Sequence, residues 1–493
     1  MVKRRRWGTA LAAVMLASAL PAMTALPSAT AGAAAGLRLI PTNDEVVAHR
    51  SRSGYVNLDP QMLLAAEGGD FEIEASRPDY DTPVAVVRNM PGGGSVALPA
   101  DLLDAWAGLQ RFLHVTVTDL DGVARYDRWA SFCPNTWDKQ RVGPDGPSFP
   151  EYPSYCGWNP FTLGMVYGIE HDWAASIGEG TYGALYTRLA AGRYRMEVRV
   201  ASRYVGLLDL DPAATSANVT LVVKDRRGRE PEPSTPVTGT GDRAPHVPID
   251  RAPDPAGVPD LQPLPSWGIS ARHTRRGDFL SFGANVWVAG NGPLVVEGFR
   301  RDGEDVMDAY QYFYEGDEPA GRVRVGEMEF DDRDGHEHWH FKQFAGYQLL
   351  GEDRQTVVVS SKEAFCLVPT DAIDLTLPAA DLRPGWVGLF TSCGGRRDLW
   401  IREVLPVGWG DTYYQYLPGQ SFDITDVPNG VYYVKVVANP GRQLVELTYS
   451  NNVRLRKVII SGKPGRRRVE VPPWHGIDTE GWVQRYGLGP FVG

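Results

Sequence analysis

The sequence predicts a mainly β protein with two β-sandwich-like modules, and three observations carry this prediction. Short runs rich in β-branched and aromatic residues recur along the chain, and Gly, Pro, Asn or Asp bounds each of them. Helical periodicity is scarce. A proline-rich stretch near the middle of the 493 residues separates two groups of such runs. Antiparallel sandwiches are the natural architecture for this pattern.

Residues 1–31 are predicted to be a signal peptide. The chain begins with Lys3 and Arg4–Arg6, continues as an apolar run, and offers Ala29 and Ala31 as a small-residue cleavage site. The arginines also admit the twin-arginine export route, although "RRRWG" is a poor version of that signal. No later segment holds the roughly 18 uninterrupted apolar residues of a membrane span. We therefore expect a secreted, extracellular protein with no membrane span.

The charge of the chain argues against nucleic acid as a partner. The formal net charge is -10, and loss of Lys3 and Arg4–Arg6 with the leader would bring it to about -14. An acidic protein does not attract the phosphate backbone. Its long-range field mildly favours cationic partners.

The N-terminal module is predicted to span residues 37–225. Strands are expected at "RYRMEVRV" (193–200) and "NVTLVV" (218–223), and "ADLLDAWAGLQRFL" (100–113) is the main helix candidate. Residues 226–257 are poor in hydrophobic side chains and contain spaced prolines, which resist helix and strand interiors. This stretch is predicted to be an extended linker.

The C-terminal module is predicted over residues 258–462, followed by a tail over 463–493. Strands are expected at "FLSFGANVWVAG" (279–290), "QTVVVSS" (355–361), "VYYVKVVA" (431–438) and "NVRLRKVII" (452–460).

The two modules end with similar sequences. The matched positions are Gly192, Tyr194 and Val198 with Gly430, Tyr432 and Val436, and Ser216, Asn218 and Val219 with Ser450, Asn452 and Val453. Two interpretations remain open. The modules either contain unrelated hairpins with the same turn chemistry, or descend from a duplicated sandwich whose first copy lost its site.

The stretch "RDGHEHWHFKQF" (333–344) places His336, His338 and His340 at alternate positions. Alternate residues of a strand share a face, but the outer two imidazoles of a flat strand would lie roughly 13 Å apart. A bulge or loop next to Gly335 would let all three bind one ion. Imidazole suits copper, zinc, iron or nickel. The alternatives are a solvated polar strand face and a purely structural metal site.

Four ordered motifs resemble the lysyl oxidase family. "GHEHWHFKQFAGYQLL" (335–350) is similar to the family's copper-binding segment, whose pattern is His-x-His-Tyr-His. "SSKEAFCL" (360–367) and "GDTYYQYLPGQSFDITDV" (410–427) resemble the stretches with its cofactor lysine and tyrosine. "NGVYYVKVVANPGRQLVELTYSNNV" (429–453) resembles its closing hairpin. The resemblance covers roughly residues 258–462.

The resemblance implies an enzyme with a cofactor made from its own chain. Lys362 and Tyr413 fall on the positions that form lysyl tyrosylquinone, and His336, His338 and His340 fall on the copper ligands. The implied activity is oxidation of primary amines, either peptidyl lysine or small amines, by dioxygen. The products would be aldehydes, hydrogen peroxide and ammonia.

The individual site residues also have simpler explanations. Lys362 could be a solvated lysine at a strand end, and Tyr413 could pack in an aromatic-rich loop. Acid–base chemistry needs carboxylates within hydrogen-bond reach. Asp411, Asp423 and Asp426 are candidates that the sequence does not rank.

A calcium site is also implied by the resemblance. Its ligands would be Asp260, Leu261, Glu446, Asn451 and Asn452. Thr448 replaces one aspartate of the family pattern, which removes an anionic ligand. Oxygen ligands still suit calcium, and a β-turn with Asx capping is the alternative.

The cysteines fall into two local pairs. In an exported chain, this even number favours one disulfide in each half. The animal lysyl oxidases carry a cysteine just before the histidines, where this chain has Gly335. Without that bond, the resemblance implies the pairs Cys133–Cys156 and Cys366–Cys393.

A second function stays open from the sequence. The chain could be a non-catalytic secreted protein that binds a metal or another surface on the same fold, because sites rather than folds carry function. The sequence does not reveal the substrate, the oligomeric state or the role of residues 37–225.

Overall fold

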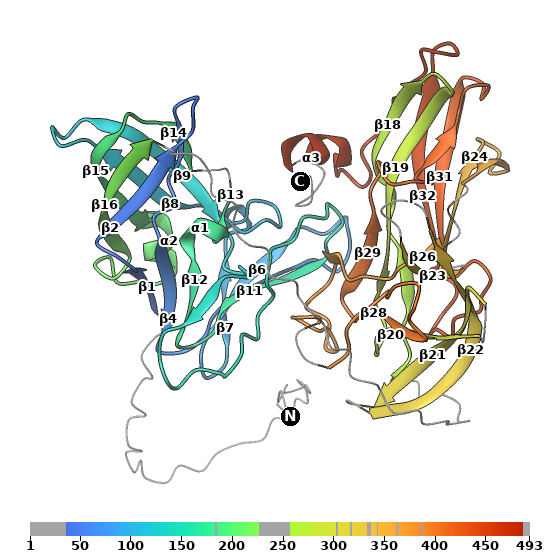
Figure 1. Cartoon of the computed structure of the whole chain (residues 1–493), viewed down its shortest axis with the longest axis horizontal. Helices are drawn as coiled ribbons and strands as arrows, with labels where there is room; N and C mark the ends of the chain where they lie inside the picture. The colour runs from blue at the N-terminus through green and yellow to red at the C-terminus, as the bar shows by residue number, and fades with distance from the viewer. Residues whose placement is uncertain are drawn as a thin grey trace, which may run out of the picture. The chain divides into compact units, whose positions relative to one another are not determined.

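The computed structural model of the protein describes residues 36–182, 185–225, 257–301, 304–315, 318–332, 337–342, 344–360, 362, 364–385 and 388–486. All of them belong to one compact unit, residues 34–493. The predicted signal peptide, all but the last residue of the predicted linker, Gly335 and His336 lie outside the described residues. The fold is mainly β, as the sequence predicts (Figure 1).

The strands of the N-terminal part, residues 36–225, form three sheets and one two-stranded pair within the described residues. The first sheet has the order β1 (Gly36–Pro41), β4 (Met62–Glu67), β12 (Trp173–Ser176) and β10 (Lys139–Arg141). The second has the order β11 (Gly164–Ile169), β5 (Phe71–Ser76), β6 (Ala85–Asn89) and β7 (Ser95–Leu98). The third has the order β13 (Thr181–Tyr182), β9 (Ala124–Phe132), β8 (Leu109–Thr118), β15 (Gly192–Val200), β16 (Ser216–Asp225) and β2 (Glu45–Arg50). The pair is β14 (Tyr186–Arg188) with β3 (Tyr55–Asn57).

Three further sheets are formed by the described strands of the C-terminal part, residues 257–486. One follows the order β17 (Leu261–Pro263), β19 (Gly277–Val288), β29 (Trp409–Tyr413) and β27 (Asp371–Ala372), and β18 (Trp267–Thr274) and β30 (Ser421–Asp423) also pair with β19. Another has the order β26 (Ala364–Phe365), β23 (His338–Lys342), β22 (Glu318–Asp331), β21 (Val306–Glu315), β20 (Leu294–Arg300) and β28 (Trp400–Leu405). The last has the order β25 (Thr356–Val359), β24 (Ala345–Leu350), β31 (Gly430–Ala438), β32 (Val453–Ser461) and β33 (Arg468–Glu470).

Helices are short in the described residues. They are the 3-10 helix Ala100–Leu102 and the α-helices α1 (Ile177–Gly180), α2 (Ser202–Leu207) and α3 (Thr479–Tyr486). None of them has the length and apolar composition needed to traverse a bilayer.

The six predicted strands are confirmed, whereas the predicted helix over residues 100–113 is wrong. Only a 3-10 turn forms there, and strand β8 starts at Leu109. Ala105 and Gly108 have φ values of 51° and 133°, which interrupt any helix. The last apolar residues of the predicted helix, Leu109, Phe112 and Leu113, instead belong to β8, which lies between β9 and β15 in a sheet.

The two similar hairpins, β15–β16 and β31–β32, contain the same tyrosine contact. Tyr194 donates its hydroxyl hydrogen to the carbonyl of Ala190 at 3.0 Å, and Tyr432 donates to Pro428 at 2.7 Å. In both cases a buried tyrosine bonds back to the residue four positions earlier. This matches the shared sequence pattern and leaves both interpretations of it open.

Two large hydrophobic cores organise the described chain. One lies mainly within the N-terminal part and the other within the C-terminal part. The first core also contains Ala372, Leu375, Leu382 and Trp409 from the C-terminal part. The backbone of Leu163 donates to Ile373 at 2.7 Å, and Leu375 donates to Gly164 at 3.0 Å. The strand with Trp409 is therefore supported by residues of the N-terminal part.

Candidate active site

Strand β23 carries two of the three predicted copper ligands. His338 and His340 share one strand face, and their ring centres lie 4.5 Å apart. His340 is buried, and its Nδ1 atom lies 3.7 Å from an oxygen of Asp331 on strand β22. His336 lies outside the described residues. Among the described residues, no group of three or more His, Cys, Asp or Glu side chains is placed to hold a metal ion. The chemistry of the two described imidazoles fits copper.

Trp339 fixes the same strand from its opposite face. Its side chain is fully buried, and its indole nitrogen donates to the carbonyl of Gly395 at 3.0 Å. Its backbone nitrogen donates to the carbonyl of Cys393, also at 3.0 Å. Cys393 forms a disulfide with Cys366, and Cys133 pairs with Cys156, as the resemblance implies. The histidine strand is thus connected to the segment that follows Lys362.

The structure brings Lys362 and Tyr413 together. The Nζ atom of Lys362 lies 4.5 Å from the centre of the Tyr413 ring and 5.1 Å from that of Phe365. Phe365 meets the edge of Tyr413 with ring centres 5.0 Å apart. The Tyr413 hydroxyl donates to the carbonyl of Cys366 at 3.0 Å. An amine therefore lies over the face of a phenol whose orientation is fixed by a hydrogen bond.

A glycine allows the backbone around Lys362 to pack closely. Gly419 has a φ of 81°, and a Cβ atom at this position would lie 2.9 Å from the Cβ of Lys362. Ser360 donates its hydroxyl to the carbonyl of Gly419 at 2.5 Å and accepts from the backbone of Lys362 at 3.2 Å. The two segments predicted to carry the cofactor residues are therefore joined directly.

The strand register places the backbone of the histidine strand beside this pair, while strand alternation turns the side chains of His338 and His340 to the face opposite Phe341. Phe341 of β23 pairs with Phe365 of β26 in an antiparallel arrangement. The next residues along the two strands are His340 and Cys366, and the carbonyl of Cys366 is the one that Tyr413 contacts. Three segments that are distant in sequence thus meet at one end of β26.

The structure distinguishes Asp411 from Asp423 and Asp426, the other two acid–base candidates, by its burial. It is buried on the same face of β29 as Tyr413, with which it interacts. Burial raises the pKa of Asp411 well above its usual range, and a contact with Tyr413 and the charge of Lys362 oppose that shift. Asp423 and Asp426 are exposed, and Asp423 accepts from the backbone of Thr425 at 2.9 Å.

Glu403 is a site neighbour that sequence reasoning missed. Its side chain is fully buried and accepts from the backbone nitrogen of Leu367 at 3.1 Å. Burial raises its pKa well above the usual range, and the charge of Asp411 adds to this shift. Burial is the largest cause of the raised pKa of Tyr413, and the charges of Asp411 and Glu403 raise it further. The feature of the sequence that could have identified Glu403 is a carboxylate within the largely apolar strand "WIREVL" (400–405).

A cleft of about 320 Å³ opens beside Lys362. Its wall includes Tyr347, Gln348, Val359 and Ser360. Tyr347 is buried and interacts electrostatically with Asp411. The cleft offers a small molecule or a side chain a route to Lys362.

The five predicted calcium ligands lie together. Glu446 accepts from the backbone of Leu261 at 3.0 Å and from the side chain of Asn452 at 2.7 Å. Asp260 accepts from Asn451 at 2.8 Å. One side-chain oxygen each of Asp260, Asn451 and Asn452 is buried without a hydrogen-bond partner. Burial raises the pKa of Glu446, although the amides of Asn439 and Asn452 oppose this. A buried group of unpaired oxygens suits a hard cation.

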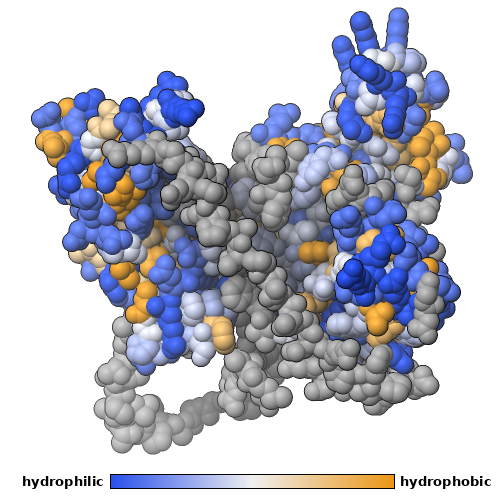
Figure 2. Space-filling view, in the orientation of Figure 1, coloured by the Kyte–Doolittle hydropathy of each residue, from blue (hydrophilic) through white to orange (hydrophobic). Residues whose placement is uncertain are grey.

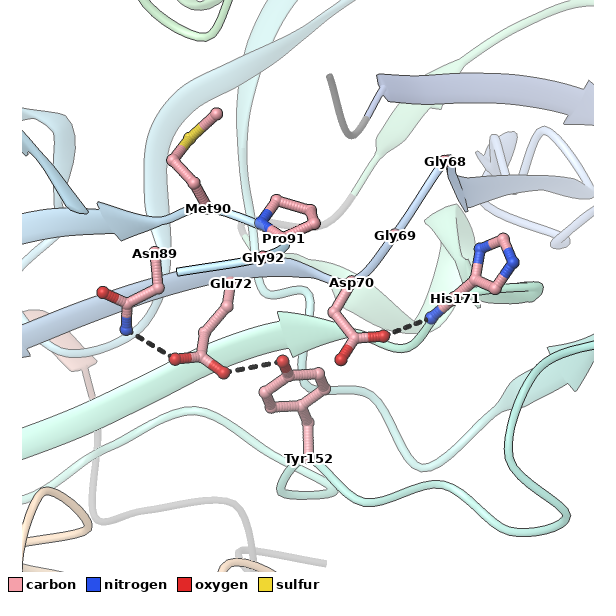
Figure 3. A pocket seen from close by; sticks show the side chains of 10 residues that line it. All are labelled: Gly68, Gly69, Asp70, Glu72, Asn89, Met90, Pro91, Gly92, Tyr152 and His171. Atoms are coloured by element: carbon pink, nitrogen blue, oxygen red, sulfur yellow. Dashed lines mark hydrogen bonds between the residues drawn. The ribbon is translucent and has the colours of Figure 1, made fainter. Parts of the chain in front are cut away.

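The N-terminal part contains a separate pocket of about 530 Å³ (Figure 3). Glu72 accepts from Asn89 at 2.6 Å and from Tyr152 at 2.7 Å, and Asp70 accepts from the backbone of His171 at 2.7 Å. Both oxygens of Glu72 are thus occupied within the protein. None of the residues that line this pocket was predicted to be part of the site.

Comparisons with known proteins place related sequence in the C-terminal part. The lysyl oxidase family profile matches residues 392–467. Lysyl oxidase homolog 2 of Gallus gallus is 33% identical over 121 residues, and that of Homo sapiens is 31% identical over the same length. Lysyl oxidase homolog 2 of Xenopus laevis is 28% identical over 133 residues. The matched stretches cover 24% to 27% of this chain and only 14% to 15% of these relatives.

Proposed function

Because the chain belongs to the lysyl oxidase family through its C-terminal part, we propose that it is a copper- and quinone-dependent amine oxidase. Its substrates would be primary amines, either peptidyl lysine or small amines. The observation that carries this proposal is the 4.5 Å separation between Lys362 Nζ and the Tyr413 ring centre. A solvated lysine at a strand end would have no reason to lie over the ring of a partly buried tyrosine.

Two groups would complete the site. Copper held by His336, His338 and His340, and a quinone made from Lys362 and Tyr413, would supply the oxidation of the amine by dioxygen to an aldehyde, hydrogen peroxide and ammonia. The donor set fits a copper site, and the stacked amine and phenol fit a cross-link. The family membership supports both groups.

The residues of the chain itself would position and deprotonate the reacting groups. Lys362 must lose its Nζ proton before it can act as a nucleophile. We infer that an Oδ atom of Asp411 accepts this proton, because the carboxyl is buried beside Tyr413 and interacts with Lys362. The carbonyl of Cys366 orients the phenol through its 3.0 Å hydrogen bond. The cleft at Tyr347 and Val359 would admit the substrate amine and limit access of bulk water.

Three broader proposals accompany this one. Residues 1–31 would direct the chain out of the cell, where disulfides persist. Residues 226–257 would link two modules. The cluster around Asp260 and Glu446 would bind calcium, which its buried unpaired oxygens support.

Peptide mass analysis tests the enzymatic proposal directly. Copper-loaded protein exposed to air should yield the Lys362 and Tyr413 peptides as one covalently joined species. Lys362→Ala and Tyr413→Phe should each abolish the joined species and the release of peroxide from primary amines. Tyr414→Phe is the matched control because its ring stacks with Tyr416 instead of with Lys362, and it should retain both.

The opposite result would reject the oxidase. Separate, unmodified peptides and no peroxide from copper-loaded wild-type protein would instead favour the non-catalytic metal-binding alternative. In that event His338 and His340 would still bind a metal, which titration with copper or zinc would reveal.

A further inference from the structure

One end of the C-terminal part carries a cluster of exposed cationic side chains, which we call the basic tip. It consists of the β18–β19 turn and the β32–β33 connection, at the upper right of Figure 1. Its exposed cationic residues are Arg272, Arg275, Arg276, Lys463, Arg466 and Arg468. Hydrophilic side chains project from this end in Figure 2. The concentration is notable in a chain whose formal net charge is -10.

Buried hydrogen bonds hold the two loops together. Asp278 is almost fully buried, and its Oδ2 atom accepts from the backbone nitrogen of Gly465 at 2.6 Å. Its other oxygen lies 2.6 Å from Nδ1 of His273. Arg467, buried beneath the tip, donates to the carbonyl of Thr425 at 3.0 Å. The exposed cations therefore project from a fixed base, which lowers the entropic cost of binding a partner.

The six cations form no ion pair with the part of the chain that the structure describes. Within the described residues, none of them lies within ion-pair distance of a carboxylate. Other arginines of the same part are paired: Arg301 and Arg324 both bind Asp308, at 2.7 Å and 2.6 Å. Six like charges placed together raise the local potential and attract anions, although the exposed carboxylates of Asp423 in β30 and Glu470 in β33 offset part of this charge. The basic tip thus has the properties of an anion-binding surface.

We propose that the basic tip binds an extracellular anionic polysaccharide that carries sulfate or phosphate groups. Five of the six cations are arginines, whose planar guanidinium forms paired hydrogen bonds with the oxygens of such groups. No large hydrophobic side chain is exposed over residues 267–278 or 461–470, all of which are described. The surface therefore lacks the apolar residues that insert into membranes and the exposed aromatic rings on which bases stack.

The position of the basic tip would leave the cleft accessible. Strand β19 runs from Gly277 at the tip to Ala284, which pairs with Tyr413. The seven residue steps between them span about 23 Å of extended chain. A polymer bound at the tip would hold the protein in place while amines still reach Lys362. This inference stands on the charges of the tip and does not require the proposed oxidase.

Binding to defined polyanions tests the proposal with the full chain. The probes are two immobilised polysaccharides, heparin, which carries sulfate, and phosphorylated dextran, which carries phosphate, with neutral dextran as the blank. The wild-type protein should bind one or both charged probes, and the affinity should fall steeply with salt. Which probe binds identifies the anionic group. Replacement of Arg272, Arg275 and Arg276 by Gln should weaken binding by about tenfold or more and flatten the salt dependence.

A second set of variants makes the result specific to the tip. Replacement of Lys463, Arg466 and Arg468 by Gln should weaken binding to the same extent, because both loops contribute three cations. The charge-matched control replaces the exposed Arg52, Arg128 and Lys224 by Gln and should leave binding unchanged. Circular dichroism should give identical spectra for all variants.

Three outcomes would overturn the proposal. These are no binding to either polyanion, equal losses in the control variant, or full affinity in both tip variants. Binding to anionic lipid vesicles but to neither polymer would likewise reject it, in favour of a membrane surface.

Discussion

Asp411 is the residue that we propose as the proton acceptor of the site. The carboxyl of Asp411 is buried two positions before Tyr413, whereas that of Asp423 is exposed and accepts a hydrogen bond within its own turn. Burial without a full set of hydrogen bonds disfavours the ionised form. The charge of Asp371, which is also buried, raises the pKa of Asp411 further.

The raised pKa of Asp411 predicts the pH dependence of cross-link formation. An acid whose pKa is raised stays protonated at low pH and becomes a base only as the pH increases. The rate of joining between the Lys362 and Tyr413 peptides should therefore rise with pH. Asp411→Asn should lower this rate by about 10²- to 10⁴-fold and remove the rising limb. Timed mass analysis across a pH series measures both effects.

The exposed Asp423 provides the control. Asp423→Asn should keep the wild-type rate and pH profile, because its carboxylate does not contact the pair. A wild-type profile in Asp411→Asn would exclude this carboxyl as the proton acceptor.

At the scale of elements, the site exists because short strands meet at their ends. Strand β29 presents Asp411 and Tyr413 on one face, while Thr412 on the other face accepts a hydrogen bond from Asn285 at 2.8 Å. Strand β26 contains only two residues, yet it connects the histidine strand to Lys362. Strands β23 and β29 each contribute two of the proposed site residues, and the register decides which groups meet.

The close approach at Gly419 can be tested by one methyl group. Gly419→Ala adds a Cβ that would lie 2.9 Å from the Cβ of Lys362, at a φ of 81°. We expect a loss of about 1–2 kcal/mol in the free energy of unfolding from backbone strain and a lower yield of the cross-link from displacement of Lys362. Denaturant unfolding and peptide mass analysis measure the two effects separately.

A second glycine distinguishes the effect of backbone strain from the effect of the close contact with Lys362. Gly54 has a φ of 85°, and no atom lies within 4 Å of the position that a Cβ would take there. Gly54→Ala should therefore cost a similar amount of stability without any change in cross-link yield. Equal cross-link losses in the two variants would show that the packing at Gly419 is not specific.

At the scale of the whole molecule, the N-terminal part supports the strand that carries Tyr413. Trp409 of β29 is buried in the N-terminal core, and Tyr155 donates to the carbonyl of Thr370 beside that strand at 3.2 Å. Thr370 in turn accepts from the backbone of Thr412 at 2.7 Å. The N-terminal part is thereby in contact with the framework of the site.

The calcium proposal also belongs to this scale, because it joins residues 191 positions apart. Calcium bound only by the folded chain should raise its stability by about 2.7 kcal/mol at a hundredfold excess over the dissociation constant. A chelator should lower the melting temperature of wild-type protein accordingly. Thermal unfolding with calcium and with chelator measures this shift.

Glu446→Gln should make the melting temperature insensitive to calcium, since it removes one anionic ligand. Glu470→Gln, at an exposed carboxylate, is the control and should keep the full shift. Identical melting curves for wild-type protein with and without calcium would reject the site.

Local chemistry determined what the sequence alone could predict. Alternation and β-branched residues identified the mainly β class and six strands, because side-chain burial in a strand follows a period of two. The resemblance of four ordered motifs to the lysyl oxidase family implied the roles of Lys362 and Tyr413. The helix predicted over 100–113 failed because sheet pairing overrides a local apolar pattern.

Only the tertiary structure decided which of these groups meet. The stacking of Lys362 on Tyr413, the burial of Asp411 and Glu403, and the contact of Asp260 with Asn451 all depend on pairing between distant strands. A strand register shifted by one residue would turn each side chain to the opposite face. The sequence therefore determined the chemical groups and their local faces, whereas long-range register determined their neighbours.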